Sequence, residues 1–205
     1  MSTVLIIVAL VAVLVIVSAT VLYLGPGKGG GRRGLKRRFG PEYDRAVAGH
    51  DGDTKAAERE LNERVKRHGA LKERPLANET RELYVAQWTV LQERFVESPD
   101  GAVAAADQLL ARLAGERGFP EAARYEEQLA ALSVHHAELV GGYRRVHRAA
   151  HGQASTEELR EAMVDGRALF EALVTPRPED TRVHRSGAVG LGRRGHLLKP
   201  KGSGA

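Results

Sequence analysis

Residues 3–24 form an apolar run of 22 residues without a charged side chain. After Thr3, only Ser18, Thr20 and Tyr23 add side-chain polarity. As a helix with a rise of about 1.5 Å per residue, this run is about 33 Å long, which matches a hydrocarbon core of about 30 Å. Because lipid offers the backbone no hydrogen-bond partner, the run must be helical there. The sequence therefore predicts a transmembrane helix within residues 1–24, with the lipid bilayer as its partner.

A cleaved secretory signal is the alternative interpretation of this run. Such signals have a basic first region, an apolar run of about 7–15 residues and a small-x-small cleavage site. Residues 1–3 contain no basic side chain, and the apolar run here is longer. Around Ser18 and Gly25 the sequence offers only poor cleavage sites. These departures favour a retained anchor over a cleaved signal.

The stretch that follows, residues 25–40, is glycine-rich and basic and contains no acid. Its six cations are Lys28, Arg32, Arg33, Lys36, Arg37 and Arg38. Basic flanks of a membrane span stay in the cytoplasm. We therefore expect a single-pass protein of the plasma membrane, with its N-terminus outside the cell and its C-terminal domain in the cytoplasm. We interpret residues 25–40 as a flexible juxtamembrane linker, and its six cations as a membrane-surface set that faces anionic lipid headgroups.

The same stretch formally matches G-x-G-x-x-G through Gly25, Gly27 and Gly30. A phosphate-binding loop of this type needs a preceding strand and a following helix. Here the predicted membrane helix precedes it, and Lys28 is followed by glycine where a Walker loop has Ser or Thr. Topology explains these residues better than phosphate binding does.

Charge is strongly segregated along the chain. Residues 41–175 hold 18 Lys/Arg and 24 Asp/Glu, whereas residues 176–205 hold seven Lys/Arg and two Asp/Glu. The isoelectric point near 9.7 therefore reflects two short segments and not the body of the protein. RNA-binding modules usually combine cations with stacking aromatic residues, and residues 176–205 contain none. This composition argues against nucleic acid as a partner, and we expect the basic tail at 176–205 to be disordered.

Helical periodicity dominates the body, so the fold class is expected to be all-α. Residues 41–74 form a charged helical segment. Proline in the first-turn position predicts a short helix that starts at Pro41. A second helix has a narrow stripe of Ala57, Leu61, Val65 and His68, which we expect to be exposed or to form a weak coiled-coil seam.

Residues 75–175 are predicted to form a small antiparallel helical bundle of five helices. Asn78, Ser98 with Pro99, Pro120, Ser133 and the Ser155-x-x-Glu158 capping box mark the five predicted starts. Each helix has one apolar stripe, and the short connections favour antiparallel neighbours. Gly141 and Gly142 fall in the fourth helix, where they indicate either a close helix contact or a break.

Residues 87–120 contain a set of distinctive elements, namely Trp88, the run Gln92-x-Arg94-Phe95-Val96, Gly101-Ala102, Ala106-Asp107 and Arg117-Gly118-Phe119-Pro120. In these elements the chain resembles a family of small proteins of unknown function from high-GC Gram-positive bacteria. The resemblance covers about residues 80–175 together with the N-terminal segment. It implies a helical domain on a membrane tether, and it brings neither an activity nor a functional residue.

Candidate catalytic and metal-binding residues are few. The chain has no cysteine. His147 and His151 are four residues apart and share a helix face, but no sequence motif supplies a third ligand, so we expect them to lie on a solvated basic face. The clusters Glu126-Glu127 and Glu157-Glu158-Glu161 suit helix starts better than general acids. No G-x-S-x-G motif is present.

These observations predict a non-enzymatic, membrane-tethered helical protein that acts as an interaction or scaffold module with an unknown protein partner. No catalytic residue, cofactor or metal site is assigned. An enzyme or metal-binding protein with a dispersed His/Glu site is the alternative.

Overall fold

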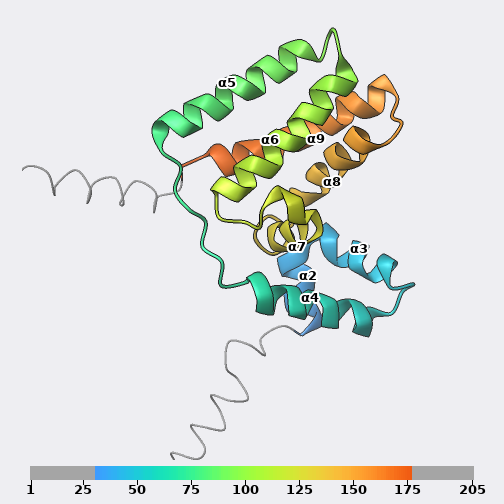
Figure 1. Cartoon of the computed structure of the whole chain (residues 1–205). Helices are drawn as coiled ribbons and strands as arrows, with labels where there is room; N and C mark the ends of the chain where they lie inside the picture. The colour runs from blue at the N-terminus through green and yellow to red at the C-terminus, as the bar shows by residue number, and fades with distance from the viewer. Residues whose placement is uncertain (1–30, 177–205) are drawn as a thin grey trace, which may run out of the picture.

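The computed structural model describes residues 31–176, and every regular element within them is a helix (Figure 1). The elements are α2 (Arg32–Phe39), α3 (Pro41–Gly49), α4 (Thr54–His68), α5 (Asn78–Arg94), α6 (Pro99–Glu116), the 3-10 turn η1 (Ala122–Arg124), α7 (Tyr125–His135), α8 (Val140–His151) and α9 (Thr156–Val174). The expected all-α helical bundle is confirmed for this part of the chain.

Three predictions concern residues beyond this range. The membrane span at residues 3–24, the cation Lys28 and the tail after Pro176 lie outside the described residues. Of the helices within residues 31–176, none has both the length and the apolarity that a bilayer crossing requires.

The larger hydrophobic core is built from the apolar stripes of α5, α6, α8 and α9, to which α7 adds Leu129 and Leu132. Trp88 of α5 and Phe170 of α9 are buried, and their rings stack with centroids 4.6 Å apart. α6 contributes the largest number of buried residues, and Figure 1 shows it between α5 and α8.

A second, smaller core lies between α2, α3, α4 and α7 (Figure 1). Ala57 and Leu61 of α4 are fully buried there, against Phe39, Tyr43 and Val134 of the neighbouring helices. The prediction that the charged helix is exposed is therefore wrong. Its stripe is narrow, but three apolar side chains, Ala57, Leu61 and the partly buried Val65, suffice when α2, α3 and α7 cover it.

The prediction of a flexible linker over residues 25–40 is wrong for residues 32–39, which form α2. Leu35 and Phe39 are four residues apart, so they share one face of the helix, and both are buried. The cations of α2 are all exposed. High glycine content and charge in the sequence obscured this apolar pair.

Three predicted helix starts, those of α3, α6 and α9, follow the sequence, whereas after Pro120 the 3-10 turn η1 comes first and α7 begins only at Tyr125. Pro41 and Pro99 stand at first-turn positions of α3 and α6, and the Asp53 carboxylate accepts the main-chain N–H groups of Lys55 and Ala56 at the start of α4. The capping box of Ser155 and Glu158 is present at the start of α9. Asn78 is the first residue of α5, and Ala77 occupies the cap position instead.

Ser133 does not cap a helix, contrary to prediction. α7 continues through it to His135, and the next helix starts at Val140. The Ser133 side chain is buried, donates to the Ala130 carbonyl at 2.7 Å and accepts from Arg64 at 3.2 Å. A buried serine with two partners satisfies its hydroxyl within the helix, so no cap is needed.

Gly142 marks a close contact between α8 and α9. A Cβ atom at this position would lie 2.7 Å from the main-chain carbonyl carbon of Asp165 and still closer to its oxygen. Gly141, one residue earlier, faces open space. Of the two alternatives left by the sequence, the structure shows the helix contact.

Replacing Gly142 by alanine should destabilise the fold by about 1–3 kcal/mol, because main-chain atoms of α9 have to move to accept the methyl group. Gly141→Ala is the matched control and should leave the free energy of unfolding unchanged or raise it by up to about 1 kcal/mol. Urea unfolding followed by circular dichroism measures both. Equal effects of the two substitutions would contradict the assigned contact.

Candidate functional site

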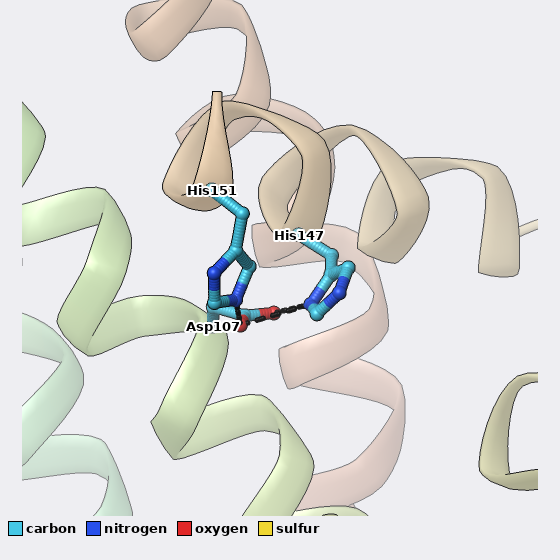
Figure 2. A group of neighbouring side chains, drawn as sticks. All are labelled: Asp107, His147 and His151. Carbon is cyan, nitrogen blue, oxygen red and sulfur yellow. Dashed lines mark hydrogen bonds and ion pairs between the residues drawn. The ribbon is translucent and has the colours of Figure 1, made fainter. Parts of the chain in front are cut away.

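His147 and His151 share one face of α8 and both turn toward Asp107 of α6 (Figure 2). The Nδ1 atom of His147 lies 3.0 Å and 3.1 Å from the two Asp107 carboxylate oxygens. The Nε2 atom of His151 lies 3.2 Å from the Oδ2 atom of the same carboxylate. The imidazole rings are adjacent, with centroids 4.4 Å apart.

Exposure rises outward from the carboxylate of this cluster. The Asp107 side chain is 9% exposed, that of His147 31% and that of His151 64%. A buried carboxylate is costly unless it is paired. The two imidazoles supply the partners for Asp107, and solvent reaches the cluster from the His151 side.

The aromatic ring of Tyr125, on α7, packs against one side of the cluster. The ring stacks on His147 with centroids 3.6 Å apart and an interplanar angle of 14°. Burial raises the pKa of Tyr125 to about 12, so its phenol is neutral at physiological pH. The stacking of Tyr125 on His147 restricts the orientation of the His147 ring.

Burial likewise raises the pKa of Tyr143, whose hydroxyl donates to the buried Gln128 side chain at 2.9 Å.

The donor atoms of this cluster suit a divalent transition metal ion. One atom from each of Asp107, His147 and His151 lies within 4.8 Å of the others, so a single ion between them could contact all three. Two imidazoles and one carboxylate are ligands that zinc and several neighbouring metals accept. The same geometry also serves as a purely structural ion-pair cluster in which the imidazoles donate to the carboxylate.

Asp107 is the residue that sequence reasoning missed. Its two partners are 40 and 44 residues away, and no local motif connects them. One indication was present in the sequence. Asp107 stands between two short apolar runs, residues 102–106 and 109–111, where a solvated charge is out of place. The prediction of a solvated basic face needs correction, because His147 is half-buried and both histidines pair with this carboxylate.

The structure does not bring His135 and His136 to this cluster. His135 contacts the His68 carbonyl oxygen at 2.8 Å. His136 pairs with the buried Glu73 at 2.9 Å, and Glu73 also binds the fully buried Arg117 at 3.0 Å. These contacts attach the segment after α4 to the larger core, so we assign them a structural role.

Four of the five glutamates of the predicted clusters lie where the helix-start interpretation places them, and Glu161 lies in the second turn of α9. Glu126 and Glu127 are in the first turn of α7, and Glu157 and Glu158 are in the first turn of α9. Negative charge stabilises that end of a helix.

The described members of the membrane-surface set lie together on α2. They are Arg32, Arg33, Lys36, Arg37 and Arg38, and all five are exposed. Lys36 pairs with Asp44 at 3.4 Å, and both of these side chains are well exposed. The buried residues Leu35 and Phe39 fix the opposite face of α2 to the smaller core.

Comparisons with protein-family models, curated proteins and solved structures give no match for this chain. The resemblance described from the sequence therefore stays a prediction.

His68 provides a test of pH-dependent stability. It is buried at the end of α4, and its Nε2 atom has no hydrogen-bond partner among the described residues. Burial lowers the pKa of His68 below its ordinary value of 6.5, so the unfolded chain binds this proton more readily than the folded chain does. The free energy of unfolding should therefore fall as pH decreases below about 6.5.

Substitution His68→Leu should flatten this decline, because it removes the titrating group. Urea unfolding of both proteins at pH 7.5 and pH 5.5 gives the comparison. A packing change alone would shift stability equally at the two pH values, so an unchanged difference between them would contradict the assignment.

Proposed function

We propose that this protein is a membrane-tethered, non-enzymatic helical module that presents interaction surfaces at the cytoplasmic face of the plasma membrane. The observation that carries the proposal is the exposed basic face of α2 directly after the predicted span. Each cation near an anionic membrane contributes about 1 kcal/mol of attraction, so the five cations together favour a lipid surface.

Chain length supports a short distance between the folded body and the bilayer. The predicted span ends at Leu24, and α2 begins at Arg32. The seven intervening residues, 25–31, reach at most about 25 Å when fully extended. Because Leu35 and Phe39 anchor α2 in the smaller core, the helical body would follow the position of the tether.

Reporter fusions at the two termini test the proposed orientation. A cytoplasmic reporter should be active at the C-terminus and inactive at the N-terminus. Replacing Lys28, Arg32, Arg33, Arg37 and Arg38 by glutamine should increase the fraction with the opposite orientation, because the positive flank sets topology.

The matched control replaces the same number of exposed cations elsewhere by glutamine. These are Lys55, Lys66, Arg145, Arg160 and Arg167, and they should leave orientation unchanged. Digestion of the helical body by protease added to wall-free intact cells would overturn the proposed topology.

A second candidate function is divalent transition metal binding by Asp107, His147 and His151. The observation that favours it is the convergence of three ligands, one carboxylate and two imidazoles, on one point, with one side open to solvent. Metal sites with three protein ligands keep a position for water or a further ligand. Such a site would make the module metal-responsive or supply a reactive centre.

Zinc titration of the chelator-treated full-length protein in neutral detergent tests this candidate. Calorimetry should show one ion bound per chain. Asp107→Asn and His147→Ala should each weaken binding by at least about tenfold, since loss of even an outer-shell partner has effects of this size. His50→Gln is the control, because His50 is another partly exposed histidine paired with a carboxylate, that of Glu60, at 2.7 Å. The absence of stoichiometric zinc, or equal binding by Asp107→Asn, would contradict a metal site.

A further inference from the structure

A cleft of about 410 Å³ lies where α3, α4, α7 and α8 meet, on the side of His147 where Tyr125 stacks. Its polar lining consists mainly of Arg45, Arg64, Tyr125, Arg144, His147 and Arg148. Glu126 is the one carboxylate among its described lining residues. Four guanidinium groups from three helices therefore line one hollow, where cations concentrate the electric field.

Two of these arginines are held in position by buried or half-buried groups. Arg144 forms a bidentate ion pair with the buried Glu42, with nitrogen–oxygen distances of 2.5 Å and 2.8 Å. Arg64 binds Glu60 and donates to Ser133 at 3.2 Å. A guanidinium has five N–H donors, so each of these contacts leaves donors for a ligand in the cleft.

The other two arginines are exposed and are not occupied by a carboxylate. Neither Arg45 nor Arg148 makes an ion pair within residues 31–176. They lie on α3 and α8, so they reach the cleft from different helices. In contrast, Arg145, the neighbour of Arg144 on α8, points elsewhere and pairs with Asp165 at 2.6 Å.

We propose that this cleft binds a phosphate group between the fixed guanidinium groups of Arg64 and Arg144 and the exposed ones of Arg45 and Arg148. Guanidinium groups match phosphate oxygens in geometry as well as charge. Four of them offer more donors than the two oxygens of a carboxylate accept. One face of the Tyr125 ring is covered by His147, so that face does not stack on a nucleobase. The proposal requires neither the membrane tether nor a bound metal ion, although His147 belongs both to the cleft lining and to the candidate metal cluster.

Phosphate binding to the full-length protein in a neutral detergent tests the proposal. Isothermal titration calorimetry with inorganic phosphate at low ionic strength should show one saturable site. The double substitution Arg45→Gln with Arg148→Gln should weaken binding by about tenfold or more, since both groups would make charge-assisted hydrogen bonds to the ligand. Both side chains are exposed, so the variant should keep its helical circular dichroism and thermal unfolding midpoint.

The matched control is Arg145→Gln, which removes one exposed arginine from the same helix outside the cleft and should bind phosphate as the unmodified protein does. A second titration with short-chain phosphatidic acid below its micelle concentration distinguishes the source of the phosphate. Tighter binding of this lipid, with loss in the double variant, assigns the cleft to a lipid headgroup. Binding of inorganic phosphate alone assigns it to a soluble ligand. Failure of both probes to saturate, or binding that survives the double substitution, overturns the proposal.

Discussion

The close approach of α8 to α9 is the contact on which the candidate sites depend. Glycine permits it at two positions. Gly142 of α8 faces the Asp165 carbonyl, and a Cβ atom at Gly166 of α9 would lie 2.6 Å from the Val146 side chain. With Tyr143 and Val146 buried, the rotation of α8 about its axis is determined. The helix then presents His147 and His151 to Asp107, Arg144 and Arg148 to the cleft, and Arg145 to Asp165.

Polar contacts, in addition to apolar ones, attach the N-terminal helices to the remaining bundle. Arg144 of α8 binds Glu42 of α3, and Arg64 of α4 binds Ser133 of α7. Such partly buried pairs contribute modestly to stability, because desolvation offsets much of the attraction. Their main effect is on side-chain geometry. They orient two guanidinium groups at the junction and place the cleft where the two hydrophobic cores meet.

Sequence reasoning was accurate where a local rule determines structure and failed where distant segments meet. Proline and capping residues marked the starts of α3, α6 and α9, whereas the stacking of Trp88 on Phe170 became visible only in the structure. The burial of α4 was missed, because its narrow apolar stripe becomes a buried face only when α2 and α7 pack against it. The histidine pair was visible from its spacing. Asp107 was not, because only the packing of α6 against α8 brings it there.

The length of the predicted tether limits how far the cleft can lie from the bilayer. If the span ends at Leu24, residues 25–31 hold α2 within about 25 Å of the bilayer, and α2 packs on the same small core as α3 and α4. Arg45 of α3 and Arg64 of α4 line the cleft, so two of its four arginines lie on the part of the fold nearest in sequence to the tether. A lipid headgroup is then available at high local concentration, whereas a soluble phosphate has to compete with the anionic surface for the same arginines. A preference of the cleft for the lipid headgroup would therefore agree with a helical body held at the membrane, whereas binding of inorganic phosphate alone would agree with a soluble ligand.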